Sequence, residues 1–459
     1  MERVKRRWWT ASVSVLASLV VAAAVLSGLF QLAVLALPGY REQLSDYVSK
    51  VADRPIDIGG IALVWYRLRP QLELDDIVLY GDDGETPALS AEQLRIGFGL
   101  MRLLRGDTFP NQIELAGLQV VVEIDADNQV HLRGLDTAGR AKAQHDWRRD
   151  LGRFDSIRLE DCVVTVDDAR LAGGLPRFRL VQAEAQRRLG GASLEASVEL
   201  PGFMGDSAEF EASISGDLDR PDDWQGRWSL SLEQLKRLPW LEARLPGRPR
   251  VQLTDADLSI GGDIEQGRLT GADITLDASR IEASRGERQA QIGKVDFAAS
   301  LRRDGRSWTL EVPALRLSGA SGDWPSTRLH LQYTPLGQQV GGGSELQADA
   351  DFLRLQDLAP WLMLADDPSM ARLGGVSGQL RHLVGRGTVG GNAPPRYSLR
   401  AQLDGLGYAP KDDAPGFSGL QGEVSATESG GRLAMTGQPF ELQAARVLKN
   451  YLVGTPSQL

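Results

Sequence analysis

Histidine and cysteine, which commonly carry catalysis or bind metals, are few in this chain of 459 residues, and they lie far apart. Motifs of serine nucleophiles, phosphate-binding loops and zinc proteases, such as G-x-S-x-G, a Walker loop and H-E-x-x-H, are missing. The four histidines share no metal-ligand spacing with one another or with the single cysteine: His131, His145, His330 and His382. We therefore expect no enzyme activity, no metal and no cofactor.

Three further groups could do chemistry, and each has a simpler interpretation. Residues 385–390, "GRGTVG", match the dinucleotide motif, but "GNAPP" follows and cannot start the required helix, so a loop is expected. Asp167 and Asp168 are adjacent and would point to opposite faces of a strand, which predicts a solvated strand end. Cys162 has no partner for an internal disulfide and is interpreted as a small buried apolar residue.

Composition and charge narrow the class of protein. The net charge of −10 and the pI near 5.2 argue against a nucleic-acid partner, which requires a basic stripe. Lysine and arginine are spread along the body of the chain without clustering. The 51 glycines favour many short strands separated by turns. Length alone suggests about three domains.

One basic cluster stands at the N-terminus, where four cationic residues and two tryptophans precede the charge-free residues 10–37. That stretch exceeds the ~20 residues that cross a bilayer. Because cationic residues stay on the cytoplasmic side, we expect residues 1–9 in the cytoplasm, a transmembrane helix at 10–37 and the remainder outside. A cleaved signal peptide is disfavoured, because no small-x-small site follows an apolar core of ~7–15 residues. The cationic residues and tryptophans are Arg3, Lys5, Arg6, Arg7, Trp8 and Trp9.

After the expected anchor, the chain repeats one strand pattern. "LELDDIVLYGDDG" (72–84), "IELAGLQVVVEID" (113–125) and "IRLEDCVVTVDDA" (157–169) are spaced by 41 and 44 residues. Each has alternating apolar residues, then Asp or Gly, then alternating apolar residues in the opposite phase. Because side chains alternate with period two, this slip would reverse the apolar face. A bulge or sharp bend at Asp76, Gly117 and Asp161 would return both halves to one side.

Other segments extend this organisation. "YREQLSDYVSKVAD" has apolar residues at helical spacing, and Pro55 ends the helix. Two similar segments lie 121 residues apart and end in Pro239-Trp240-Leu241 and Pro360-Trp361-Leu362. Each segment predicts a strand that leads into a short helix. We expect two β-rich regions, 38–220 and 221–459, with about four short helices and two dozen strands.

Such repeats cannot bury their apolar faces alone. With so few helices, two solutions remain open from the residue pattern. Either the strands form several separate sandwiches, or they form one curved sheet whose apolar concave face takes a non-protein filling.

The ordered set of segments resembles the AsmA-like family, most closely its large YhdP-type members. It begins with the basic start, the anchor and "VADRPIDIGGIALVWYRLRPQLELDDIVLYG", with Arg54-Pro55, Trp65 and Pro70 at matching places. "LSAEQLRIGFGLMRLLRGD", "IELAGLQVVVEIDADNQVHLRGL" and "APGFSGLQGEVSATESGGRLAMTG" follow in order. YhdP-type proteins are much longer, so the chain is expected to correspond to an N-terminal portion or a truncated form.

The resemblance implies a fold and a function. The family is similar to chorein-type bridge-like lipid-transfer proteins, which implies a mainly β protein: an N-terminal transmembrane helix and an elongated groove of antiparallel strands. It implies a bacterial inner-membrane anchor, a periplasmic body and phospholipid carried toward the outer membrane. Phospholipids and the inner membrane are the expected partners, with outer-membrane or other envelope proteins as further candidates. The groove candidates are Leu118, Val120, Val122, Ile124, Val164, Val166, Phe210, Ile214, Val295, Phe297, Leu310 and Val312.

A second function from a different class stays open. In this alternative, the same strands form closed sandwiches that act as a non-catalytic scaffold for outer-membrane protein assembly. Neither possibility specifies the lipid, or the direction and energy source of transport.

Overall fold

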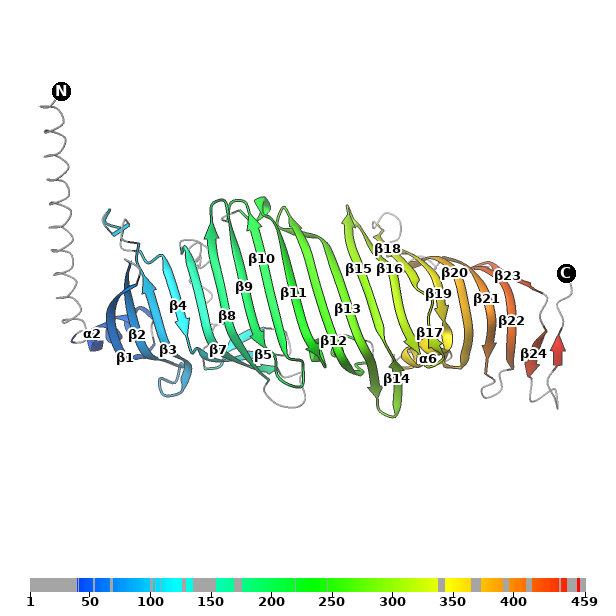
Figure 1. Cartoon of the computed structure of the whole chain (residues 1–459), viewed down its shortest axis with the longest axis horizontal. Helices are drawn as coiled ribbons and strands as arrows, with labels where there is room; N and C mark the ends of the chain where they lie inside the picture. The colour runs from blue at the N-terminus through cyan, green and yellow to red at the C-terminus, as the bar shows by residue number, and fades with distance from the viewer. Residues whose placement is uncertain are drawn as a thin grey trace, which may run out of the picture. The chain divides into compact units, whose positions relative to one another are not determined.

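The fold is that of a computed structural model, in which the chain forms two compact units, Met1–Leu189 and Gly190–Leu459. Helix α2 and strands β1–β8 belong to the first unit, and strands β9–β25 with helices α5 and α6 to the second (Figure 1). The structure describes residues 39, 41–52, 54–66, 69–99, 102–103, 105–107, 109–125, 129–134, 154–168, 176–218, 220–245, 247–336, 343–364, 373–390, 396–409, 415–436, 439–443 and 452–454.

The first unit begins with the expected helix, which packs against a β-sheet. Helix α2 ends just before Pro55, and Ser49 receives a hydrogen bond from the Ile56 backbone N–H at 2.9 Å. Strands follow in the order β1-β2-β3-β4/β5-β7-β8, with β4 and β5 sharing one position and β6 pairing with β5. The elements are α2 (Arg41–Ala52), β1 (Ile56–Tyr66), β2 (Arg69–Tyr80), β3 (Pro87–Gly97), β4 (Gln112–Ala116), β5 (Gln119–Ile124), β6 (Val130–Leu132), β7 (Ser156–Asp168) and β8 (Arg177–Arg188).

The second and third sequence repeats lie side by side in this sheet. Strands β4 and β5 pair with β7 in parallel, with partners such as Ile113↔Ile157 and Val120↔Val164. Every partner pair is separated by 44 residues, the spacing of the repeats. The other pairings in this unit are antiparallel, so the expectation of an all-antiparallel sheet was wrong at this one position. Equivalent residues of two repeats can align in this way only when the strands run in the same direction.

The predicted slips in phase coincide with left-handed backbone. Asp76, Gly117 and Asp161 have φ angles of 50°, 64° and 51°. Glycine adopts this region freely and aspartate more readily than most residues. Leu74 and Ile77, on either side of Asp76, belong to one apolar cluster, so both halves of this strand face the same side. The bend was therefore predicted correctly, and no extra residue is inserted.

These positions belong to a continuous line across the sheet, which we call the reversal row. The strand partners on either side place its members opposite one another on successive strands. Apolar alternation changes phase at this line in each repeat. The row consists of Gly59, Asp76, Glu92, Gly117, Asp161 and Val181.

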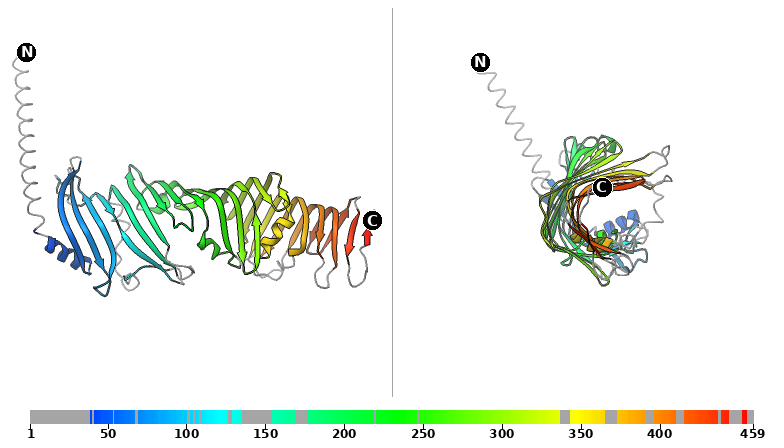
Figure 2. Two further views of the ribbon diagram at one scale, coloured as in Figure 1. Left: turned by 60° about the horizontal axis from the view of Figure 1, so that its bottom comes forward. Right: turned by 90° about the vertical axis from the view of Figure 1, so that its right-hand side faces the viewer.

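The second unit is an antiparallel sheet whose strands follow one another mostly in chain order. In the left view of Figure 2 these strands, green to red, are visibly bowed. Short strands β14, β17 and β24 share positions with β15, β18 and β23. The strands are β9 (Gly191–Glu199), β10 (Ser207–Ser215), β11 (Gln225–Leu235), β12 (Arg250–Glu265), β13 (Arg268–Arg285), β14 (Arg288–Ile292), β15 (Val295–Asp304), β16 (Ser307–Gly319), β17 (Gly322–Asp323), β18 (Thr327–Pro335), β19 (Ser344–Arg354), β20 (Val376–Val389), β21 (Tyr397–Tyr408), β22 (Gly416–Thr427), β23 (Gly430–Met435), β24 (Phe440–Gln443) and β25 (Leu452–Gly454).

Both Pro-Trp-Leu segments form the short helices predicted for them. They are α5 (Pro239–Glu242) and α6 (Leu355–Leu362), and 3-10 turns cover Pro221–Asp223 and Leu373–Gly375. Trp361 of α6 packs on buried clusters that include Phe352 and Leu364. It is therefore a core residue.

Two sequence-based expectations were wrong locally. Residues 385–389 belong to strand β20 and do not form a loop, because Gly385 and Gly387 pair with β19 on one side and β21 on the other. Pairing on both sides overrides the poor strand preference of glycine. Asp168 is only 4% exposed and pairs with Ile124, so this strand end is not solvated.

The expected transmembrane helix at 10–37 lies outside the described residues. Among the helices that the structure does describe, none has the length and apolar character needed to span a bilayer.

Candidate functional site

The first unit presents one continuous apolar face. Leu74, Leu94, Leu115 and Leu159 are direct partners on successive strands, and Ala183 of β8 completes the row. Direct partners in a sheet point to the same side. A second row, beyond the reversal row, has Leu89, Val120, Val164 and Phe178 as successive partners.

The first-unit groove candidates are placed on this face by the strand register. Val120 lies beside Val164, and Val122 lies beside Val166. Leu118 lies at the break between β4 and β5, where its carbonyl accepts a hydrogen bond from the Val163 backbone N–H at 2.6 Å. Ile124 differs from the other candidates, because its strand partner is the buried Asp168 and not an apolar residue.

The second unit repeats the arrangement over more strands. Phe210 of β10 has Ala196 and Leu230 as partners, and Leu230 in turn faces Ile260. Ile214 lies on the same side, between Ala192 and Gly226. Farther along the sheet, three successive leucines of β15, β16 and β18 are partners: Leu301, Leu310 and Leu331.

Within the part of the chain that the structure describes, much of this apolar face has no covering layer. Leu194, Leu331, Leu399 and Leu433, from β9, β18, β21 and β23, remain 36–43% exposed. Leucine side chains in a closed sandwich core would be almost fully buried. Their exposure in four separate strands identifies a surface able to accept apolar material.

Helix α6 covers one part of the apolar face. Val295 is 5% exposed and packs with Trp324 and Phe352, and Leu358 of α6 packs against the same cluster. Val312 is also buried, at 7%. These two candidates have little surface left for a ligand, whereas Phe297, beside Leu276, is half-buried.

The opposite face of the first unit carries charges of alternating sign. Glu73, Arg95, Glu114, Arg158 and Glu184 are successive strand partners. The Arg95 guanidinium lies 2.8 Å from the Glu73 carboxylate and 2.7 Å from that of Glu114, and hydrogen bonding to Glu73 is the main cause of its raised pKa. A one-residue slip would break every pair, so the row favours the observed register.

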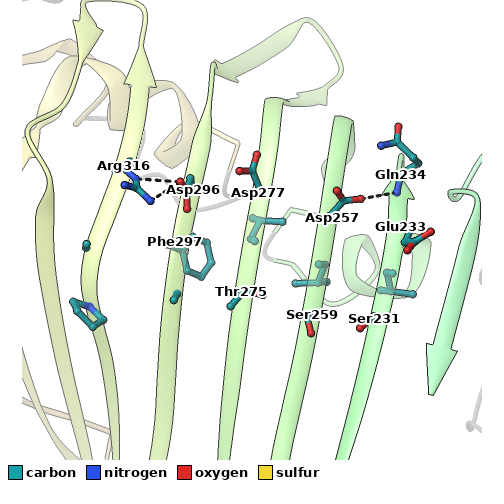
Figure 3. Close-up of a pocket in the computed structure, with 16 residues that line it drawn as sticks. Ser231, Glu233, Gln234, Asp257, Ser259, Thr275, Asp277, Asp296, Phe297 and Arg316 are labelled. Atoms are coloured by element: carbon teal, nitrogen blue, oxygen red, sulfur yellow. Dashed lines mark hydrogen bonds and ion pairs between the residues drawn. The ribbon is translucent and has the colours of Figure 1, made fainter. Parts of the chain in front are cut away.

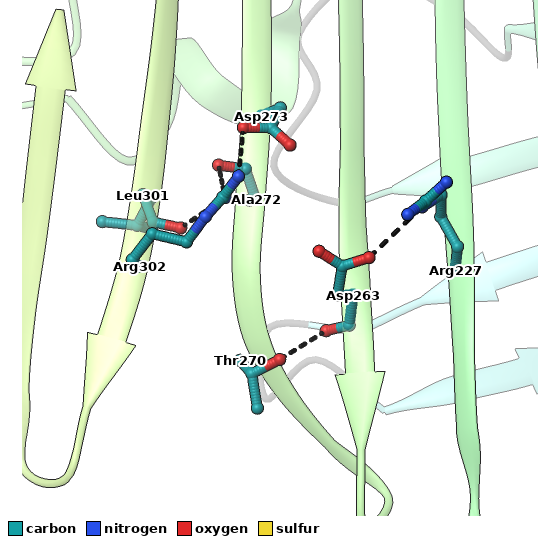
Figure 4. A network of polar contacts seen from close by, with 7 residues as sticks. All are labelled: Arg227, Asp263, Thr270, Ala272, Asp273, Leu301 and Arg302. Atoms are coloured by element: carbon teal, nitrogen blue, oxygen red, sulfur yellow. Dashed lines mark hydrogen bonds and ion pairs between the residues drawn. The ribbon is translucent and has the colours of Figure 1, made fainter.

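The second unit uses similar pairs on its polar face. Arg227 lies 3.2 Å from Asp263, and Arg302 lies 2.7 Å from Asp273 (Figure 4). All four side chains are substantially exposed, so each pair contributes little stability. Their effect is to keep one face charged while the other is apolar.

A depression of about 630 Å³ crosses β11–β16 and is bordered by an acidic row. Asp257, Asp277 and Asp296 are successive partners, followed by Arg316 (Figure 3). The Asp257–Asp277 and Asp277–Asp296 pairs place like charges side by side, which lowers the stability of the sheet at this row. Within the described part of the chain, no group of acidic residues, histidines or cysteines is arranged to hold a metal ion.

Cys162 behaves as the sequence predicted. It is fully buried and forms no disulfide. Burial raises the pKa of its thiol, which disfavours the nucleophilic thiolate.

Comparison with known proteins identifies the family. A family model described as YhdP protein matches residues 1–457. The chain belongs to the YhdP family. It is similar to the intermembrane phospholipid transporter YhdP of Escherichia coli (strain K12), with 23% identity over 348 residues, which cover 74% of this chain and 26% of that relative. The chain thus spans about a quarter of that relative's length, and no solved structure matches it.

Some features of this YhdP-family chain were missed from its sequence. Left-handed residues also occur in the second unit at Gln234, Asp255 and His382. The signal was present in β12, where Val251 and Leu253 precede Asp255 and apolar alternation resumes in the opposite phase at Ala256. Because Leu253 and Leu258 pack in one cluster, the left-handed residue Asp255 keeps both halves of β12 apolar on the same side, as Asp76 does in β2.

Proposed function

We propose that this chain carries phospholipid along the apolar faces of its sheets, as part of transport between membranes. The observation that carries the proposal is the uncovered apolar face, with exposed leucines on β9, β18, β21 and β23. Membership of the YhdP family and the name of the Escherichia coli relative support the choice of phospholipid as cargo.

The physical basis is the cost of exposing acyl chains to water. Each CH₂ group moved from water to an apolar surface contributes about 0.8 kcal/mol. Rows of Val, Leu and Phe shield the tails while head groups remain in water. Many similar shallow positions let a lipid move without a deep energy minimum.

Membrane attachment completes the proposal. The charge-free residues 10–37 anchor the chain in the inner membrane, with residues 1–9 in the cytoplasm and the rest in the periplasm. The outer membrane is the destination. The chain supplies a passive surface, and its function is not enzymatic.

Lipid analysis of the purified protein tests this function. The full chain is extracted in mild detergent, separated from free micelles and analysed by mass spectrometry. Near-stoichiometric phospholipid is expected, because the uncovered face binds acyl chains. A monodisperse protein without lipid would favour the scaffold role and contradict lipid carriage.

A further inference from the structure

A short segment of the second unit is strongly basic although the chain is acidic overall. Residues 236–250, "KRLPWLEARLPGRPR", hold five basic residues and one acidic residue, in a chain of net charge −10. The acidic residue, Glu242, is buried and bound to Arg237 at 2.6 Å. The remaining cationic groups of the segment are not neutralised by it.

The fold adds further arginines at the same rim of the sheet. Arg285 and Arg288 face each other across the β13–β14 hairpin, on the side of the sheet that carries Val251, Ala283 and Ala290, whereas Arg250 precedes Val251 and points to the opposite side. We call Arg244, Arg248 and Arg288 the arginine rim.

Contacts with the end of α6 bring these segments together. Arg285 donates to the Leu364 carbonyl at 3.2 Å, and Arg288 donates to that of Met363 at 2.8 Å. A Cβ atom added to Gly247 would lie 2.3 Å from the Leu364 oxygen and 3.0 Å from an Arg285 nitrogen. The loop after α5, the hairpin and the end of α6 therefore form one surface.

The rim differs from the arginines of the polar face. Arg227, Arg302, Arg316 and Arg328 each form an ion pair with an aspartate. Among the described residues, no ion pair joins the exposed Arg244, Arg248 or Arg288 to a carboxylate. Cationic groups gathered in this way repel one another and attract an anion.

Apolar groups adjoin the rim. Behind it, Ala283, Ala290 and Leu364 are buried in one cluster, which holds this surface in place but leaves no area of its own for acyl chains. Leu241 and Leu362, in α5 and α6, remain 52% and 37% exposed. In the described part of the chain, the buried indole N–H of Trp361 has no acceptor. This surface fits a ligand that is anionic at one end and apolar at the other.

We propose that the arginine rim binds the phosphate head group of an anionic phospholipid whose acyl chains lie on the neighbouring apolar face. Guanidinium groups form paired hydrogen bonds with phosphate oxygens. Residues at strand ends mark the border of the apolar face, which is where a head group must leave it. This inference rests on the proposed lipid carriage and adds a preference for anionic head groups.

The test compares lipids that co-purify with the full chain from a bacterial membrane of known composition. The wild type should carry more phosphatidylglycerol relative to phosphatidylethanolamine than that membrane does. Replacing Arg244, Arg248 and Arg288 with Gln should lower this ratio by about fivefold or more, because each cationic group attracts anionic lipid. The matched control carries Arg227→Gln, Arg302→Gln and Arg328→Gln, which remove the same formal charge, and should retain the wild-type ratio.

Further experiments test whether the effect of the rim variant comes from lost positive charge, from misfolding or from binding of a different ligand. Lysine at the three rim positions should keep most of the preference, and circular dichroism should show equal folding of all variants. Equal ratios in wild type and rim variant would overturn the head-group site while leaving lipid carriage intact. Absence of lipid from the wild type would overturn both proposals. Rim-dependent flotation with phosphatidylglycerol vesicles, or binding of inorganic phosphate, without a change in carried lipid would also refute the site.

Discussion

At the scale of single residues, left-handed positions determine which side of a strand is apolar. Gly117 illustrates the geometry, since a Cβ atom there would lie 2.4 Å from Cγ of Glu92 in the neighbouring strand. Its φ of 64° also disfavours any side chain. The position therefore demands glycine for two independent reasons.

We expect Gly117→Ala to destabilise the first unit by about 2–3 kcal/mol, combining backbone strain and the clash. Gly106→Ala in the same unit is the control, since its φ is 83° but no atom lies within 4 Å of the added Cβ. It should cost only about 1–2 kcal/mol. Urea denaturation of the full chain in detergent measures both.

A double variant separates the two causes. Adding Glu92→Ala to Gly117→Ala removes the Cγ and Cδ contacts at 2.4 and 2.5 Å but keeps the Cβ contact at 2.7 Å, so it should recover only part of the loss, about 1 kcal/mol. If the double variant shows no recovery, the Cγ and Cδ atoms of Glu92 are not a cause of the loss.

Asp357 is a second residue whose surroundings predict a large effect. Its side chain is 1% exposed, accepts a hydrogen bond from the Trp324 indole at 2.9 Å and lies 3.5 Å from Arg354. Asp357→Ala should cost about 3 kcal/mol, because the buried Trp324 N–H loses its acceptor and Arg354 loses its ion-pair partner. Hydrogen exchange should show α6 losing protection.

The matched control is Asp351→Ala, which removes a partly exposed carboxylate paired with Arg328 at 3.2 Å. Its cost should stay below about 1 kcal/mol. Equal losses in the two variants would show that burial of Asp357 does not govern the stability of α6.

At the scale of elements, alternation along β5 separates lipid-facing from solvent-facing positions. Photo-crosslinking residues at Val120, Val122 and Val164 should capture phospholipid, because the register places them on one apolar face. The same probe at Glu123 should capture none, since this side chain pairs with Arg133 on the opposite face. Mass spectrometry of the crosslinked lipid is the measurement, and equal capture at Val122 and Glu123 would contradict the face assignment.

Charge on the apolar face should block passage without unfolding the chain. Val122→Asp places a carboxylate where acyl chains pass, at a cost of several kcal/mol if it is removed from water. In a bacterium that depends on this protein for lipid transport, we expect lost transport and normal protein levels. Val121→Asp, beside Thr165 on the polar face, is the control and should transport normally. If Val122→Asp unfolds the chain and Val121→Asp does not, Val122 lies in a sealed core and not on a surface along which lipid passes.

At the scale of the whole molecule, the proposed function requires both units to lie outside the cytoplasm. A reporter that functions only in the periplasm should be active when it is fused after residue 60, because cationic residues precede the charge-free stretch 10–37. Replacing Arg3, Lys5, Arg6 and Arg7 with Glu should reduce export of the reporter. Activity only of a cytoplasmic reporter at the same position would refute inner-membrane anchoring with a periplasmic body.

The amino-acid sequence alone determined the local features of this protein. Strand repeats, the slips at Asp76, Gly117 and Asp161, and the helices at the Pro-Trp-Leu segments all followed from patterns within a few residues. Such features are predictable because side-chain alternation and backbone preference act between near neighbours.

Only the tertiary structure decided which segments meet. Parallel pairing of β5 with β7, strand formation at 385–389 and the covering of Val295 by α6 depend on residues distant in the chain. The arginine rim arises in the same way, because Arg248 and Arg288 share one surface only once the loop after α5 and the β13–β14 hairpin both meet the end of α6. Local sequence patterns specify an apolar face, whereas long-range pairing determines how much of that face remains uncovered and which charges border it.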